Sequence, residues 1–119
     1  MRIKRGEIYS TDLIDRVTKG LEIGKIRPAL VIQADDWNER LASTIIVPIT
    51  SQLSGYASAR TVVLEKGESN LDKDSNIVFS QIRSVDKSRL KKKIGVVSKE
   101  KIETIDRALS LTLGLINLD

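Results

Sequence analysis

The sequence of 119 residues contains no cysteine and no histidine. Without cysteine the chain can form no disulfide and no thiolate zinc site. Without histidine it lacks the usual proton carrier of enzymes and the commonest metal ligand. Aromatic residues are also scarce, with one Trp, two Tyr and one Phe, so recognition of RNA by stacked aromatic side chains has little to draw on. Any catalysis must therefore use other groups.

Long hydrophobic runs are missing as well. No stretch approaches the roughly 18 apolar residues of a membrane span, and the first residues, MRIKRGEIY, lack the apolar centre of a signal peptide. We therefore expect a soluble, cytoplasmic protein that binds no membrane. A chain of this length can bury roughly two thirds of its unfolded surface in one domain but is too short for two, so we expect one domain over residues 1–119.

Positive charge is concentrated in one stretch of the chain. The net charge is +4, but residues 83–93, RSVDKSRLKKK, hold six basic residues against the single acid Asp86, which leaves the rest close to neutral. Such a patch suits a polyanion, which it would attract in a salt-sensitive and sequence-independent way. A solvated loop is the alternative interpretation.

Short apolar runs separated by Gly, Asp, Asn and Ser favour a small, mainly β barrel or sandwich. The predicted strands are 7–13, 28–34, 44–50, 61–65, 77–81 and a short one at 94–97. Pro48 predicts that its strand lies at a sheet edge or is bulged there. The stretch LDKDSN mimics part of a calcium loop but lacks the required glycine and distal glutamate, so we expect a turn.

A helix is predicted to close the chain. Ser98 is a suitable N-cap, and Glu100 lies near the positive end of the helix dipole. The residues expected to face the core are Ile102, Ile105, Leu109, Leu113 and Ile116. Ala108, Leu111 and Leu115 widen this apolar surface. We expect a second copy of the chain to cover the extra surface in a homodimer, and packing beneath a loop is the alternative.

Arg27 stands directly before Pro28 and an apolar run suited to a buried strand. A residue before proline is extended, so Arg27 is expected at a strand mouth, where the long loop 14–25 meets the sheet. Two other stretches, VPITSQ at 47–52 and SQIR at 80–83, end predicted strands with hydroxyl and amide side chains. These ends could converge in a small barrel. Alternatively, Arg27 is a solvated flank and the amides only satisfy backbone groups at the strand ends.

In order along the chain, five stretches resemble the MazF/PemK family of toxin endoribonucleases. They are RGEIYSTDL, GxxRPALVIQ, TIIVPITSQ, LDKDSNIVFSQIRSVDKSRL and IDRALSLTLGLI, and together they cover most of the chain. The resemblance implies a small SH3-like barrel of the MazF/PemK/CcdB-like kind with a C-terminal α-helix, assembled as a homodimer.

The same resemblance implies the toxin of a type II toxin-antitoxin system. Such a toxin cuts single-stranded RNA, namely mRNA, at specific sequences without metal or cofactor and thereby inhibits translation and growth. The cuts leave 2′,3′-cyclic phosphate and 5′-hydroxyl ends. An acidic, partly disordered MazE-like antitoxin is the implied partner, and the complex of the two is expected to bind DNA.

The catalytic arginine and threonine of the family fall on Arg27 and Thr50. A guanidinium can grip two phosphate oxygens and stays charged at pH 7, whereas a threonine hydroxyl can only donate or accept a hydrogen bond. The further positions implied in substrate binding are Ser51, Gln52, Gln81, Lys25, Asn38 and Glu22. For Asn38 the two interpretations are reading of a base edge and a plain turn residue. Glu22 could act as a base, grip the antitoxin or be solvated, so the general base stays unassigned.

Two functions from other classes remain open. A gyrase poison of the same fold would depend on the last residues of the C-terminal helix rather than on Arg27 and Thr50. A noncatalytic RNA-binding barrel would bind through the KSRLKKK stretch. Replacement of Arg27 by Ala separates the first from a nuclease, and salt-sensitive RNA binding without cleavage would indicate the second.

Overall fold

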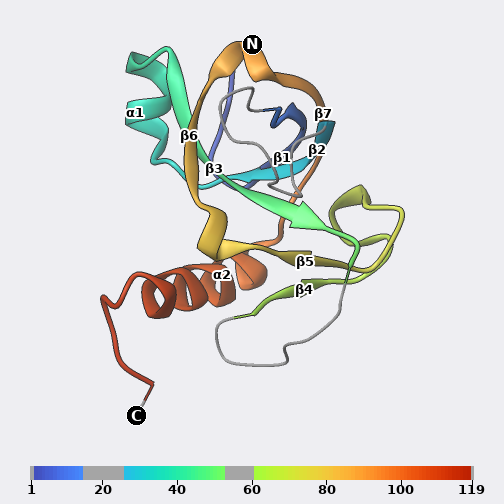
Figure 1. Cartoon of the computed structure of the whole chain (residues 1–119), viewed down its shortest axis with the longest axis vertical. Coiled ribbons are helices and arrows are strands. Elements are labelled where there is room, and N and C mark those ends of the chain that lie inside the picture. The colour runs from blue at the N-terminus through green and yellow to red at the C-terminus, as the bar shows by residue number, and fades with distance from the viewer. Residues whose placement is uncertain (1, 15–25, 53–60, 119) are drawn as a thin grey trace.

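Seven antiparallel strands form a curled, half-barrel sheet against which the C-terminal helix packs (Figure 1). The computed structural model describes residues 2–14, 26–52 and 61–118. The strands are β1 (Glu7–Asp12), β2 (Ile26–Val31), β3 (Ser43–Thr50), β4 (Val63–Leu64), β5 (Ser75–Ile77), β6 (Arg83–Asp86) and β7 (Leu90–Val96). The helices are α1 (Asp35–Arg40) and α2 (Lys99–Thr112), with 3₁₀ turns η1 (Glu68–Asn70), η2 (Phe79–Gln81) and η3 (Lys87–Arg89). The mainly β class with a C-terminal helix is confirmed.

The strands follow the order β4-β5-β3-β2-β1-β7, and β6 pairs with β3 beside this path. Strand β3 is therefore central, and the prediction of an edge strand at Pro48 is wrong. On one side β3 pairs with β6 up to Ile46 and with β5 from Ile49 onward. Pro48 lies in the gap between these two partners, and its carbonyl accepts a hydrogen bond from Val78 N at 2.8 Å. Its missing N–H faces the same gap, so no ladder bond is lost.

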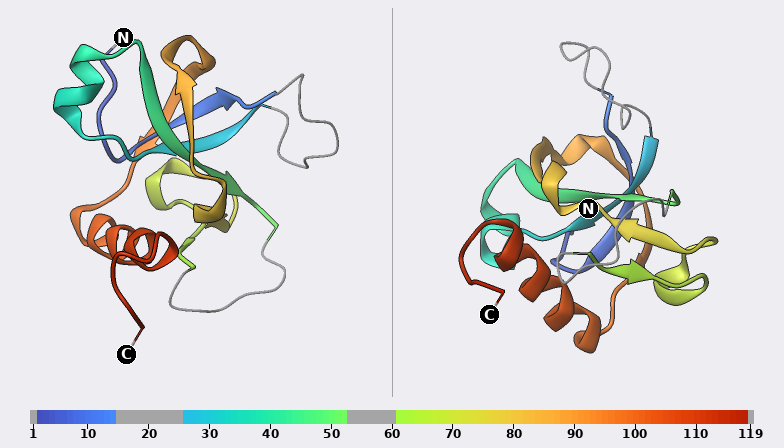
Figure 2. Two further views of the ribbon diagram at one scale, coloured as in Figure 1. Left: turned by 60° about the vertical axis from the view of Figure 1, so that its left-hand side comes forward. Right: turned by 60° about the horizontal axis from the view of Figure 1, so that its bottom comes forward.

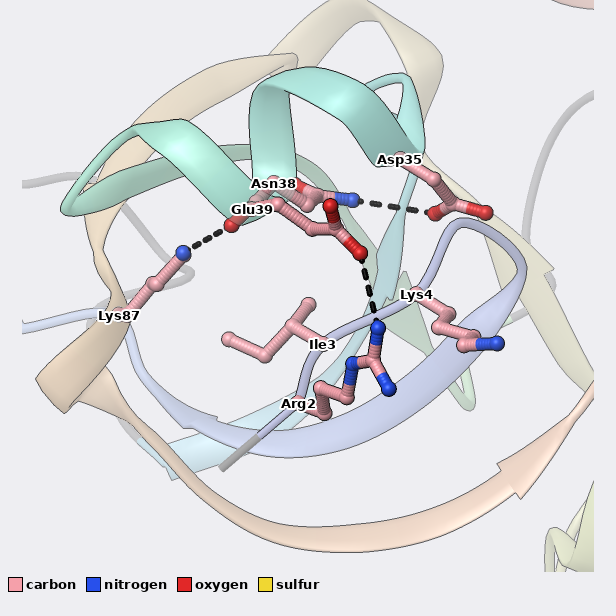
Figure 3. Close-up of a pocket in the computed structure, with 7 residues that line it drawn as sticks. All are labelled: Arg2, Ile3, Lys4, Asp35, Asn38, Glu39 and Lys87. Atoms are coloured by element: carbon pink, nitrogen blue, oxygen red, sulfur yellow. Dashed lines mark hydrogen bonds and ion pairs between the residues drawn. The ribbon is translucent and has the colours of Figure 1, made fainter.

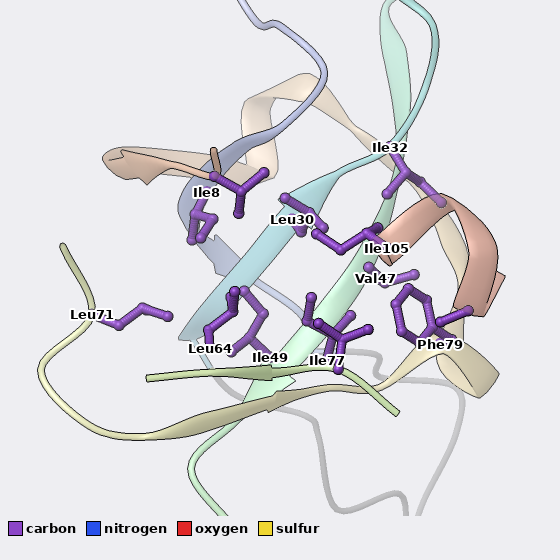
Figure 4. Close-up of a cluster of buried hydrophobic side chains, with 13 residues drawn as sticks. Ile8, Leu30, Ile32, Val47, Ile49, Leu64, Leu71, Ile77, Phe79 and Ile105 are labelled. Carbon is purple, nitrogen blue, oxygen red and sulfur yellow. The ribbon is translucent and has the colours of Figure 1, made fainter. Parts of the chain in front are cut away.

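Alternate side chains of the strands fill two apolar clusters on opposite faces of the sheet. The helix-side cluster, shown in Figure 4, contains Ile8, Leu30, Ile32, Val47, Ile49, Val62, Leu64, Leu71, Ile77, Phe79, Val97, Ile105 and Ala108. The far-side cluster contains Ile3, Tyr9, Leu13, Ala29, Val31, Ile46, Val85 and Leu90. Each central strand thus has a fixed inner and outer face, which sets the direction of the polar side chains at its ends.

Helix α2 begins as predicted, because Ser98 Oγ accepts a hydrogen bond from Lys101 N at 3.1 Å. The predicted core stripe is wrong in its last two members. The helix ends at Thr112, so Leu113 and Ile116 lie beyond it and are 48% and 39% exposed. Ala108 and Leu111, which were expected to meet a second copy, are instead buried within their own chain. Figure 2 shows the chain after α2 turning away from the helix.

Several other boundaries differ from the predictions. Strand β2 begins at Ile26, so Arg27 lies inside the strand and not before it. The predicted strand 77–81 is wrong, because β5 ends at Ile77 and η2 follows. Strand β6 and helix α1 were not predicted. Among the described helices, none has the length and apolar character required to cross a membrane.

Candidate active site

Strands β2 and β3 bring Arg27 and Thr50 to the same end of the sheet. Ala29 pairs with Pro48 across these strands, and the same register continued by two residues places Arg27 opposite Thr50. On its other side Arg27 pairs with Thr11 of β1. Residues two apart in a strand share a face, so Arg27 and Thr50 both extend the face of the far-side cluster. The two residues that the family resemblance implied as catalytic therefore lie in one row.

Arg27 is partly exposed, but its Nε atom is buried and has no hydrogen-bond partner. Among the described residues, the ion pairs join Arg2 to Glu39, Arg5 to Asp106, Lys93 to Glu7 and Lys101 to Glu68. None of these pairs involves Arg27. A buried donor on a permanently charged group, unpaired within this part of the chain, is suited to an anionic ligand with acceptor oxygens.

Thr50 is the last residue of β3 and is partly exposed. Its Oγ1 accepts a hydrogen bond from Gln52 N at 3.2 Å, which turns the chain sharply after the strand. A hydroxyl has one donor hydrogen and two acceptor lone pairs, so Thr50 keeps hydrogen-bonding capacity beyond this contact. Ser51 and Gln52 follow directly and are exposed.

Gln81 lies at the end of η2, in the connection from β5 to β6, and is exposed. The hydrogen bond from Val78 N to the carbonyl of Pro48 ties this connection to β3, two residues before Thr50. Gln81 is thus placed on the segment that flanks the end of β3. Glu22 and Lys25 lie outside the described residues.

Asn38 does not join this group. It is only 2% exposed, on α1, and its Oδ1 accepts hydrogen bonds from Thr44 Oγ1 at 2.7 Å and Gln33 Nε2 at 3.0 Å. Its Nδ2 donates to the backbone carbonyl of Gln33 at 2.9 Å and, more weakly, to Asp35 Oδ1 at 3.5 Å. These contacts occupy the amide, so Asn38 fixes the turn between β2 and β3 instead of presenting a polar edge to a ligand.

Asn38 also lines a separate hollow, about 350 Å³ in volume, beside α1 (Figure 3). The hollow is lined by Arg2, Ile3, Lys4, Asp35, Asn38, Glu39 and Lys87. Arg2 pairs with Glu39 at 2.9 Å, and Lys87 donates to the backbone carbonyl of Asn38. Because neither Arg27 nor Thr50 lines it, we do not assign chemistry to it.

Two further arginines gather near the row at the end of β1. Arg83 Nη1 donates to the carbonyl of Leu13 at 3.4 Å, and Arg89 Nη1 donates to the carbonyl of Ile14 at 2.9 Å. Both guanidinium groups are partly exposed and neither belongs to an ion pair with a described carboxylate. The sequence signal for both was the basic stretch 83–93, but its spacing alone did not separate these arginines from the neighbouring lysines.

Three lysines of that stretch, Lys91, Lys92 and Lys93, lie on β7 at the edge of the sheet, and not in the loop that was the alternative. Lys87 lies in η3. Lys93 pairs with the buried Glu7 at 2.7 Å, and Lys91 donates to the carbonyl of Ser88. Exposed lysines on an edge strand also discourage pairing with other chains. The positive charge beside the row therefore comes from Arg27, Arg83 and Arg89, whereas Lys91, Lys92 and Lys93 carry theirs along the sheet edge.

Burial raises the pKa of Glu7, but hydrogen bonds from Lys93, Lys4 N and Tyr9, together with the charge of Lys93, outweigh it and leave that pKa below its ordinary value. Burial and the hydrogen bond to Glu7 raise the pKa of Tyr9 to about 12. This network lies beneath β7 and keeps the strand fixed next to β1. We regard it as structural.

The sequence model of the family described as PemK-like, MazF-like toxin of type II toxin-antitoxin system matches residues 4–113. The chain belongs to this family of toxins. A curated relative, Endoribonuclease MazF of Staphylococcus epidermidis, is 39% identical over 117 residues, which cover 98% of this chain and 96% of the relative.

Solved structures of similar fold include MazF from Deinococcus radiodurans, with a TM-score of 0.76, 23% identity, and coverage of 96% of this chain and 98% of that one. Another is an endoribonuclease in complex with its cognate antitoxin from Mycobacterial species, with a TM-score of 0.76 and 21% identity. The match covers 97% of this chain and 98% of the mycobacterial chain. At these identities the structures support the fold alone.

Proposed function

We propose that this toxin is an endoribonuclease that cuts single-stranded RNA at the row formed by Arg27 and Thr50. The observation that carries this proposal is the Arg27 guanidinium, whose Nε is buried without a partner in the same row as a threonine hydroxyl. The activity agrees with the name of the relative that is 39% identical over nearly the whole chain.

The reaction is an internal transfer of the phosphoryl group. The ribose 2′-oxygen attacks the adjacent phosphorus, the bond from phosphorus to the 5′-oxygen breaks, and the products carry a 2′,3′-cyclic phosphate and a 5′-hydroxyl. Negative charge builds up on the non-bridging oxygens during this step. A fixed guanidinium at that point stabilises the transition state in the way an oxyanion hole does, and such donors commonly contribute about 3 kcal/mol.

Thr50 is assigned to hydrogen bonding with a non-bridging oxygen or with the attacking hydroxyl. Its own acidity is too low for it to move the proton unaided. Ser51, Gln52 and Gln81 lie next in the chain or on the flanking connection and are assigned to contacts with the bound strand. Glu22 and Lys25 keep their proposed roles as base or antitoxin contact and as phosphate contact. The step needs no metal in this proposal.

Arg83 and Arg89 extend the positive charge beside the row, and we assign them to phosphates next to the one that is cut. The same charge suits an acidic antitoxin that would compete with RNA for Arg27. The similar fold solved with a cognate antitoxin supports that partner for this chain. DNA binding by the complex is proposed from the family resemblance alone. We also propose that the chain forms a homodimer and acts in the cytoplasm.

The test is incubation of the purified protein with a long single-stranded RNA in EDTA, followed by mapping of the new ends. Wild type is compared with Arg27→Ala and with Arg107→Ala, which removes an exposed arginine of α2 on the opposite side of the sheet. We expect recurring cut sites with cyclic-phosphate ends, a loss of turnover of about 100-fold or more in Arg27→Ala, and no change in Arg107→Ala. Intact RNA with wild type, or equal cleavage by both variants, would contradict the proposal.

A further inference from the structure

Strand β5 places one more polar residue in the row of Arg27 and Thr50. Asn76 is the direct cross-strand partner of Thr50, and on its other side it pairs with Val63 of β4. Residues directly opposite in antiparallel strands carry their side chains on the same face, with Cβ atoms about 5 Å apart. Ile49 and Ile77, the next pair, point to the other face and belong to the helix-side cluster. Asn76 therefore shares the face of Thr50.

The Oδ1 atom of Asn76 is buried and has no hydrogen-bond partner. Three such side-chain atoms occur among the described residues: Arg27 Nε, Ser69 Oγ and Asn76 Oδ1. Two of the three thus flank Thr50, one on each neighbouring strand. A buried polar group without a partner lowers stability, so a native structure retains it most readily where a ligand completes the bonding.

Ser69 has a different explanation. It lies in η1 with a left-handed backbone, φ 55°, and its carbonyl would be only 2.1 Å from a Cβ atom placed on Gly95 of β7. Its burial follows from this close crossing of two backbone segments. Asn76, by contrast, lies in a regular strand pairing and is partly exposed as a residue.

The unpaired atoms along the row have complementary polarity. Arg27 Nε is a donor, the Thr50 hydroxyl can donate or accept, and Asn76 Oδ1 is an acceptor. A nucleotide offers matching groups, because its phosphate only accepts hydrogen bonds, whereas its ribose 2′-hydroxyl and the N–H groups of its base can donate them.

We propose that the Asn76 carboxamide accepts a hydrogen bond from the nucleotide whose phosphate is held by Arg27. The donor is the ribose 2′-hydroxyl or an N–H group of the base. An amide does not change charge with pH, so Asn76 orients this nucleotide and does not move its proton. This assignment rests on the proposed endoribonuclease function and adds a substrate contact to it.

The experiment compares wild type with Asn76→Val and Asn76→Ala. Valine keeps a similar volume without polar atoms, and alanine guards against a steric effect of the valine. Val63→Ala serves as the matched control, since Val63 lies opposite Asn76 on the neighbouring strand and is exposed. For each variant we would measure the melting temperature, the cleavage rate of folded protein, and the cut-site profile on a mixed pool of single-stranded RNAs.

We expect both Asn76 variants to melt at or above the wild-type temperature, because an unpaired buried acceptor is removed. Their cleavage rate should fall about 10-fold, whereas Val63→Ala should cleave normally. A loss that is equal at all cut sites assigns the contact to the ribose, and a loss confined to one base at one position of the site assigns it to the base.

Unchanged rate and profile in folded Asn76 variants, with wild type active, would overturn this assignment alone. A fall in melting temperature of several degrees in both variants would also overturn it, because Asn76 would then be part of the structural framework. If wild type itself leaves RNA intact, the proposed function fails first and the Asn76 contact fails with it.

Discussion

Replacing Asn38 by Ala should destabilise the protein without altering the chemistry of cleavage. The Asn38 amide connects α1 to both ends of the turn between β2 and β3 through three hydrogen bonds of 2.7–3.0 Å, made with Gln33 and Thr44. All three residues are buried, with Thr44 at 0% exposure and Gln33 at 8%. Water therefore cannot readily replace the lost partners.

The expected loss of stability in Asn38→Ala follows from the buried groups that lose their hydrogen-bond partner. Three groups lose their partner: the Thr44 hydroxyl, one N–H of the Gln33 amide, and the Gln33 backbone carbonyl. A buried group left unpaired costs about 1–3 kcal/mol, and relaxation of the turn recovers part of this. We expect a loss of about 3–5 kcal/mol in the free energy of unfolding. At about 4 °C per kcal/mol for a chain of this size, the melting temperature should fall by roughly 12 °C or more.

Urea and thermal unfolding of Asn38→Ala, with the exposed Asn117→Ala as control, measure this loss. Cleavage per folded molecule, assayed well below the melting temperature, should match wild type in rate and in cut-site profile. A change in unfolding free energy under about 1 kcal/mol would refute the buried network. Normal stability combined with an altered base preference would restore the sequence-based interpretation that Asn38 reads a base edge.

Three further predictions concern the core, the acid limb of stability and the positive charge. Ile105→Ala, which empties a fully buried position where α2 meets the sheet, should lower the unfolding free energy by about 2–5 kcal/mol in urea unfolding. The pKa of Glu7 is lowered in the folded protein, so its stabilisation is present above the ordinary carboxyl pKa and is lost as pH falls. Glu7→Gln should therefore be less stable at pH 7 and flatten the acid limb of a stability-pH curve, and an unchanged acid limb would count against this account. Arg89→Ala should reduce the slope of log affinity against log salt for noncleaved RNA by about 0.7, and an unchanged slope would exclude a phosphate contact.

The sequence predicted those elements whose signals are local. Ser98 and the helical spacing after it were sufficient for the start and one face of α2, and short apolar runs bounded by turn residues were sufficient for β1 and β3. The end of α2 was not predictable in this way, because Leu113 and Ile116 continue the apolar spacing after the hydrogen-bonded helix has ended at Thr112. Apolar spacing describes which residues could face a core but does not set where the backbone stops.

The segment 75–86 was misassigned for a related reason. The run IVFSQI has the β-branched and aromatic composition of a strand, yet only Ile77 remains in β5, and the chain then turns through η2. The segment connects β5 to β6 instead of continuing a strand. Phe79 fills the helix-side cluster, and from Arg83 onward the chain pairs with β3 as strand β6. Tertiary packing decided this segment against local propensity.

The candidate site was predictable in part by resemblance, which indicated Arg27 and Thr50, but the row they form depends on register. Thr11, Arg27, Thr50 and Asn76 come from four strands and are far apart in sequence. Nothing in the local sequence around Asn76 marks it as different from a turn residue. Only the pairing of β5 with β3 brings it beside Thr50 and leaves its Oδ1 without a partner.

Pro48 connects the fold to the site. Because proline cannot donate to a ladder, β3 tolerates it only where a neighbouring strand is missing, and that gap lies between β6 and β5. The change of partner at this point allows the short strand β5 to run beside the last residues of β3, which places Asn76 next to Thr50. Ala29 on β2 and Ile46 on β3 belong to the far-side cluster and share the face of Arg27 and Thr50, so the buried cluster continues directly into the row and fixes it. Polar residues at strand ends thereby gain the rigidity of the sheet while remaining accessible to a strand of RNA.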